Sequence, residues 1–233
     1  MPSFQSLLSD TLHLFYPHVC TGCGSDIISK GNQLCLPCIH QLPHTRFGFF
    51  AANPVEKYFW GRLPLAAAHS EFYFAKGGLV QRLIHQLKYK SNLDIGQYLG
   101  RIMGDTLVQT GRFLQVDGLV PLPLYPEKQR QRGYNQAAII CQGMSVTMNI
   151  PVLENIVVRR RPTETQTRKH RTERWKNVDQ SFVVPQEKSL PGKHFLLVDD
   201  VVTTGATLEA CGSSILTAGA GALSIATLAH ADK

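Results

Sequence analysis

The sequence predicts an α/β fold in which a doubly wound parallel sheet follows a small N-terminal zinc-ribbon appendage. In the larger, C-terminal part of the chain, short apolar runs alternate with amphipathic helical segments, an order typical of parallel sheets covered by helices. Before them stand two C-x-x-C pairs, Cys20 with Cys23 and Cys35 with Cys38. Four thiolates in two tight turns are what a tetrahedral zinc site needs.

Length and composition indicate a globular protein. The chain has 233 residues, of which 43% are hydrophobic and 18% charged, enough for one large core and a small appendage. No stretch approaches the ~18 apolar residues of a membrane span, and the first residues lack the basic and apolar regions of a signal peptide. We therefore expect a cytoplasmic protein, whose six cysteines are metal ligands or core residues rather than disulfides.

Three segments are predicted. Residues 1–45 form a helix and the zinc ribbon, residues 46–64 a linker, and residues 65–233 the α/β domain. The helix spans about residues 4–16, where apolar side chains recur at helical spacing, and Pro17 ends it. In the ribbon, four cysteine ligands would make a closed, structural site. A redox C-x-x-C is the alternative, but two pairs in the cytosol favour zinc.

The basic residues of the α/β domain are concentrated in two segments. Residues 125–134 and 157–177 together hold 11 of the 24 basic residues and 3 of the 17 acidic ones, which indicates an anionic ligand rather than a basic surface throughout.

The predicted elements in order are a strand at 65–74, helices at 79–89 and 93–108, a strand at 118–124, a basic loop at 125–133, a helix from Asn135, strands at 153–158 and 181–184, the strand-and-helix unit at 195–218, and a strand at 222–228.

The stretch from residue 195 to 211 carries the strongest functional signal. An apolar run ends in Asp199 and Asp200, and a loop of small and hydroxyl residues then leads into a helix. The first amides of a helix lack internal partners and carry partial positive charge, so this loop predicts an anion site. The carboxylates would repel a phosphate and instead suit sugar hydroxyls, which implies a phosphorylated sugar. The candidate binding residues are Asp199, Asp200, Thr203, Thr204, Gly205, Ala206 and Thr207.

Residues 196–208 resemble the motif with which type I phosphoribosyltransferases bind 5-phosphoribosyl 1-pyrophosphate (PRPP). The run Leu-Val-Asp-Asp-Val-Val-Thr-Thr-Gly-Ala-Thr matches at every position with a role. The resemblance implies that the loop holds the 5′-phosphate and that the acidic pair holds the 2′ and 3′ hydroxyls of the ribose. The alternative is a buried strand with a solvated acidic turn, but such a turn rarely has both acids and this loop.

The whole order of motifs resembles the ComF/GntX family, phosphoribosyltransferase-like proteins with an N-terminal zinc ribbon that are linked to competence and DNA utilisation. This resemblance implies a type I phosphoribosyltransferase-like fold and a role in handling imported DNA. It does not identify the molecule that would accept a phosphoribosyl group. The residues that carry it, besides the four cysteines and the PRPP motif, are Leu87-Lys88-Tyr89, Val120-Pro-Leu-Pro-Leu, Arg130-Gln-Arg-Gly-Tyr-Asn-Gln136, and Thr165-Gln166 with Arg171 and Asn177.

The resemblance also implies further site residues. Arg130, Arg132 and Gly133 would hold the pyrophosphate of PRPP beside a Mg²⁺ ion, and Arg171 would join Asp199 and Asp200 as a catalytic residue. The long basic segment 159–178 would be the flexible loop that closes over the ligand and excludes water.

Two classes of function stay open. One is an enzyme that transfers ribose 5-phosphate from PRPP to an unknown acceptor. The other is a non-catalytic protein of the DNA uptake machinery that binds single-stranded DNA or partner proteins through the same fold.

Overall fold

The computed structural model describes residues 18–26, 28–29, 31–160, 181–185 and 190–231. The helix expected at residues 4–16 and most of the flexible loop expected at 159–178 lie outside the described residues.

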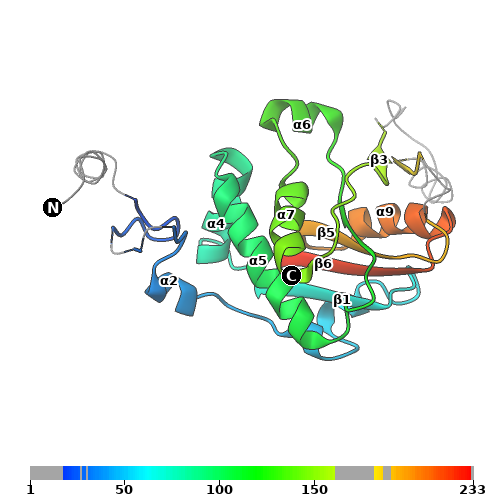
Figure 1. Cartoon of the computed structure of the whole chain (residues 1–233), viewed down its shortest axis with the longest axis horizontal. Helices are drawn as coiled ribbons and strands as arrows, with labels where there is room; N and C mark the ends of the chain where they lie inside the picture. Colours follow the sequence, from blue (N-terminus) through cyan, green and yellow to red (C-terminus); the bar gives the residue numbers. More distant parts are fainter. Residues whose placement is uncertain (1–17, 27, 30, 161–180, 186–189, 232–233) are drawn as a thin grey trace.

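A parallel sheet forms the centre of the described chain (Figure 1). Its four strands lie in the order β1-β6-β5-β2, and every neighbouring pair is parallel. This order confirms the predicted parallel sheet and places the carboxyl ends of all its strands along one edge. The strands are β1 (Ala67–Tyr73), β2 (Gly118–Pro121), β5 (His194–Val202) and β6 (Ala222–His230).

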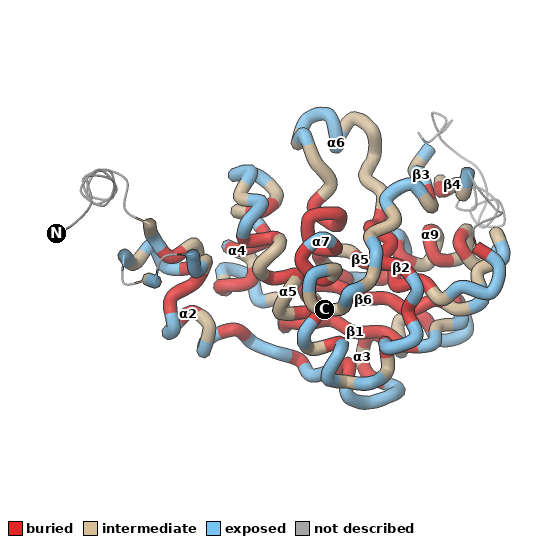
Figure 2. Tube along the Cα trace, in the orientation of Figure 1, coloured by how far each residue is buried: buried red, intermediate tan, exposed pale blue. Residues whose placement is uncertain are grey.

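Helices cover both faces of this sheet, so its central strands are apolar on both sides. Along β5, Leu196 and Val198 belong to one core, and Phe195 and Leu197 belong to the other. All four side chains are fully buried, which explains why this strand reads as an unbroken apolar run. Figure 2 shows the buried residues concentrated along the sheet and the inner sides of the helices.

The first core is covered by α4, α5 and α7, and the second by η1, α3 and α9. On the first face, α5 and α7 approach so closely that a β-carbon on Gly100 would lie 2.2 Å from the carbonyl oxygen of Ile140. Glycine at this position therefore permits the contact. The bounds are η1 Phe47–Phe49, α3 Pro54–Lys57, α4 Leu79–Tyr89, α5 Leu93–Thr110, α7 Gln136–Met148 and α9 Ala206–Thr217.

The structure corrects three sequence predictions. The basic loop expected at 125–133 is mostly a helix, α6 (Pro126–Arg132), which starts with proline at its first position and ends at Gly133 with φ of 83°. Proline and glycine at these places are ordinary helix start and stop signals. Helix α6 has no buried residue and stands out from the body of the protein (Figure 2).

The second correction is the strand expected at 153–158, which is wrong over most of its length. Val152 forms an isolated parallel bridge with Leu119, and the chain then turns before β3 (Val158–Arg159). Strand β3 pairs antiparallel with β4 (Phe182–Val183), close to the short strand expected at 181–184. The third correction is β5, which does not end at the acidic pair but continues beside β6 to Val202.

Residues 46–64 fold against β1. Asn53 is fully buried and caps α3 by accepting hydrogen bonds from the N–H groups of Val55 and Glu56. Its side-chain amide also donates to the carbonyl oxygens of Phe47 and Ala68. The domain boundaries at 45 and 64 remain a prediction. Among the described helices, none combines the length and hydropathy that a membrane span requires.

Candidate functional site

The loop between β5 and α9 forms a small cradle at the start of a helix. Thr203 and Thr204 are exposed and Gly205 adopts φ of 74° before the helix starts at Ala206. Together with Thr207 and Asp199, these residues line a cavity of about 60 Å³. The loop therefore places threonine hydroxyls and the amides of a helix N-terminus around one small space, as an anion site requires. In this state the Ala206 N–H donates to the hydroxyl of Thr204 at 3.4 Å.

Arg62, which the sequence did not single out, fixes this loop from outside. Its Nη2 donates to the carbonyl oxygen of Thr204 at 3.2 Å, and its Nη1 lies 3.3 Å from a carboxylate oxygen of Glu209 on α9. These contacts link the Thr204 carbonyl and α9 through one guanidinium. No local sequence pattern predicts this hydrogen bond, because Arg62 and Thr204 are 142 residues apart.

The two carboxylates of β5 have different surroundings. Asp200 is 4% exposed, and Lys88 Nζ lies 2.8 Å from each of its carboxylate oxygens. Asp199 accepts a hydrogen bond from the backbone N–H of Asp200 at 2.8 Å. Burial, followed by the negative charge of Asp200, raises the pKa of Asp199 to about 8, although Lys88 and Arg159 act in the opposite direction. Near neutral pH the pair therefore carries less than its full negative charge.

Arg159 on β3 packs against two aromatic rings. Its guanidinium carbon lies 3.5 Å from the ring centre of Tyr125 and 5.2 Å from that of Phe182. Its charge is one of those that lower the pKa of Asp199. The sequence placed Arg159 only within the basic segment, and the structure shows that its guanidinium lies over two aromatic rings.

The three residues expected to hold pyrophosphate lie at the end of α6. Arg130 is exposed, with its nearest carboxylate, that of Glu127, 3.8 Å away. Arg130 and Gly133 line a cavity of about 550 Å³ that also includes Arg159. Arg132 is engaged elsewhere, because its guanidinium lies 5.6 Å from the ring centre of Tyr89 and donates to the side chain of Gln136. Arg171 lies outside the described residues.

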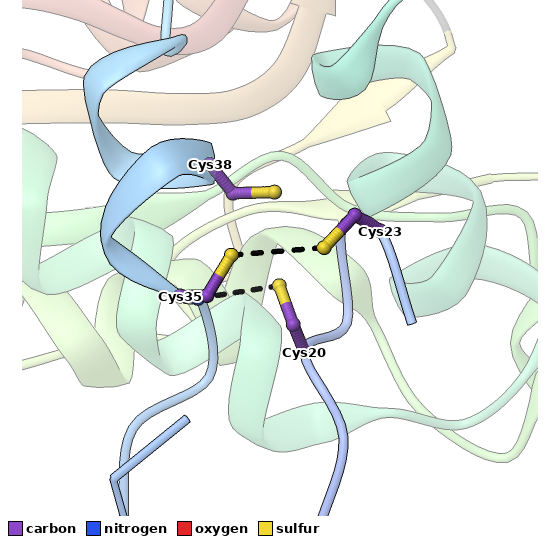
Figure 3. Close-up of side chains that lie close together, drawn as sticks. All are labelled: Cys20, Cys23, Cys35 and Cys38. Carbon is purple, nitrogen blue, oxygen red and sulfur yellow. Dashed lines mark hydrogen bonds between the residues drawn. The ribbon is translucent and has the colours of Figure 1, made fainter. Parts of the chain in front are cut away.

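The four cysteines of the C-x-x-C pairs converge on one point (Figure 3). Their Sγ atoms all lie within 4.8 Å of one another, so the cluster could hold a metal ion. Cys23 and Cys35 Sγ are 3.6 Å apart, and the backbone N–H of Cys35 donates to Cys20 Sγ at 3.2 Å. Burial opposes ionisation of Cys20, but backbone hydrogen bonds outweigh it and lower its pKa to about 6. A closed set of four sulfur donors is typical of a structural zinc site.

The second C-x-x-C pair spans the start of α2 (Leu36–His40), for which Cys35 is the N-cap residue. The ribbon then packs on α4, since a β-carbon on Gly22 would lie 2.8 Å from Leu79 Cδ1 and Arg82 Nε donates to the Gly22 carbonyl oxygen at 3.3 Å. The segment that carries the cysteine cluster and the α/β domain are therefore in direct contact.

Comparison with known proteins agrees with this architecture. A family model described as "Phosphoribosyl transferase domain" matches residues 132–233. Competence protein F of Haemophilus influenzae is 29% identical over 203 residues, which cover 85% of this chain and 84% of that protein. DNA utilization protein YhgH of Escherichia coli is 33% identical over 146 residues, which cover 61% of this chain and 63% of that protein.

Competence protein ComFC of Bacillus subtilis is 32% identical over 101 residues, 43% of this chain and 39% of that protein. A solved glutamine PRPP amidotransferase from B. subtilis overlaps 61% of this chain and 30% of that chain, with 16% identity and a TM-score of 0.43. The domain match and these relatives support a relation between this chain and the ComF family of phosphoribosyltransferase-like proteins.

Proposed function

We propose that this protein binds PRPP, or another ribose 5-phosphate ligand, at the carboxyl end of β5 and acts in the uptake and use of DNA. One observation carries the proposal: Asp199 and the loop 203–207 line the same small cavity at the N-terminus of α9. The loop amides and hydroxyls would bind the phosphate, and Asp199 and Asp200 would accept hydrogen bonds from the ribose hydroxyls.

The pyrophosphate would lie toward α6. Arg130, Gly133 and Arg159 line the larger cavity beside α6, and the charge of Arg159 lowers the pKa of Asp199. Arg132 would have to leave Tyr89 to reach the ligand. A Mg²⁺ ion bound with PRPP would neutralise phosphate charge. In the enzyme hypothesis, ribose 5-phosphate passes to an unknown acceptor as pyrophosphate leaves. The parts assigned to Arg171 and to closure of residues 159–178 stay predictions of the sequence.

The cysteine cluster would hold one structural Zn²⁺. All four donors are sulfur, and Cys20, Cys35 and Cys38 are buried, which leaves no open position for a substrate. Six cysteines kept as thiols or metal ligands suit a reducing compartment, so we also propose a cytoplasmic location.

The names of the relatives, competence protein and DNA utilization protein, support a role in DNA uptake. A non-catalytic protein that binds single-stranded DNA or uptake proteins is the second candidate. It is favoured by the exposed basic side chains of α6, Lys128 and Arg130, which suit contacts with phosphate groups.

Equilibrium dialysis with PRPP and Mg²⁺, beside single-stranded DNA at several salt concentrations, would test the proposal. A PRPP site should saturate at about one ligand per chain, as a single pocket requires. DNA affinity that depends on phosphate contacts should fall with salt, with a slope of ~0.7 per neutralised phosphate. Folded protein that takes up no PRPP but binds DNA would support the second candidate and contradict the first.

A further inference from the structure

The last turn of α4 carries a side chain into the proposed ribose site. Lys88 is 23% exposed and reaches across 112 residues of sequence to Asp200, with Nζ 2.8 Å from both carboxylate oxygens. Removing charges from water is costly, so a partly buried ion pair is weak evidence for stability alone. Its place beside a candidate ligand site points to another use.

The residues on either side of Lys88 join this turn to the segment that follows α6. The Leu87 carbonyl oxygen accepts a hydrogen bond from the Tyr134 hydroxyl, and the Tyr89 ring faces the guanidinium of Arg132 at 5.6 Å. Residues 87–89 therefore contact both the acidic pair, through Asp200, and the end of α6 with the residues after it. Because Leu87 is also fully buried, the position of Lys88 is set by the packing of α4.

The charges around Asp199 show what Lys88 contributes. Asp200 and burial favour the protonated form of Asp199, whereas Lys88 and Arg159 favour its ionised form. Burial, and then the charge of Asp199, raise the pKa of the Cys211 thiol, so this thiol stays neutral and adds no charge to the site. Without Lys88, two adjacent carboxylates would repel each other and any phosphate nearby.

We propose that Lys88 is a positioning residue of the ribose site, which holds the Asp200 carboxylate in place and offsets its charge so that the acidic pair can bind a sugar carrying a phosphate. This inference rests on the proposed ribose 5-phosphate function. It differs from a purely structural role, in which the ion pair only anchors α4.

Calorimetry with ribose 5-phosphate as the probe separates the two roles. Lys88→Met and Asp200→Asn should each weaken binding about tenfold or more, the loss expected for a charged hydrogen-bond partner. Lys88→Met in the Asp200→Asn background should cost less than about a further twofold, because Lys88 acts through Asp200. Lys88→Gln is the second variant if Lys88→Met does not fold, and Lys90→Met on the next exposed lysine is the matched control.

The pH profile gives a readout that anchoring alone would not change. In the wild type, affinity for ribose 5-phosphate should rise as pH passes about 8, where Asp199 loses its proton and becomes a stronger acceptor. Loss of the cation should move this rise to higher pH in Lys88→Met, and Lys88→Arg should restore it. A loss of affinity that is equal at every pH, or fully additive with Asp200→Asn, would overturn the inference.

Different results would contradict the proposed function and the proposed role of Lys88. If folded wild type binds no ribose 5-phosphate, the proposed function fails and this inference with it. If wild type binds it and Lys88→Met binds it equally well, only the role of Lys88 is wrong.

Discussion

The backbone of Gly205 lies against the ring of Phe59: a β-carbon on Gly205 would be 2.9 Å from two ring carbons. Phe59 is 1% exposed and belongs to the core beneath α9. Gly205 also has φ of 74°, a conformation that costs residues with a side chain. The glycine of the proposed phosphate loop is therefore favoured by backbone conformation and by packing, independently of any ligand.

Gly205→Ala should therefore destabilise the protein more than strain alone predicts. The left-handed conformation costs roughly 1–2 kcal/mol, and overpacking against Phe59 adds about 1–3 kcal/mol. Gly192→Ala is the matched control, since Gly192 has the same φ of 74° and nothing within 4 Å of its added carbon. Urea unfolding should show a larger loss for Gly205→Ala. Equal losses of unfolding free energy in the two variants would mean that the Phe59 ring moves aside without cost.

The acidic pair should make the unliganded protein less stable as pH rises. Folding raises the pKa of Asp199 from 3.8 to about 8, so the folded state binds more protons than the unfolded state between these values. Its contribution to the free energy of unfolding therefore falls as pH rises from about 4 to about 8. Asp199→Asn should flatten this slope, and Asp105→Asn, an exposed acid on α5, should not. Unfolding measured across this range would contradict the account if wild type and Asp199→Asn had the same slope.

The cysteine cluster should contain about one zinc per chain, because four thiolates complete a tetrahedral site. Cys38→Ser should lose the metal and increase hydrogen exchange in residues 31–42. Cys141→Ser should keep it, since Cys141 is fully buried in the α/β core. Metal analysis and hydrogen exchange of the two variants would decide. Zinc-free wild type with full protection of these residues would show that the ribbon needs no metal.

The sequence predicts elements well where one local pattern determines them. Helix α4 has the predicted bounds, 79–89, because its apolar side chains repeat at helical spacing and Gly78 precedes it. The extension of β5 to Val202 was missed because Asp199 and Asp200 interrupt the apolar run, although Val202 is buried and the strand continues to pair with β6. Helix α6 was missed because it has no buried face to create a periodic pattern, although Pro126 and Gly133 mark its ends.

In the candidate site, too, local motifs are predictable from the sequence and contacts between distant segments are not. The acidic pair and its loop form one continuous motif, so the sequence alone predicts them as candidate ligand-binding residues. Lys88, Arg62 and Arg159 reach the site from distant elements, and only the fold reveals their partners. Lys88 stood within a motif that carried the family resemblance, but nothing in the sequence paired it with Asp200.

The central claim is that a ribose 5-phosphate group binds at the acidic pair and the loop of α9. Calorimetry of PRPP with Mg²⁺, on wild type, on Asp199→Ala/Asp200→Ala and on the Asp105→Asn control, tests it most directly. Wild type and control should bind about one PRPP per chain, and the double variant should bind at least about tenfold more weakly, because hydrogen bonds to charged acceptors are lost. Binding of PRPP by the folded double variant with wild-type affinity would contradict the claim.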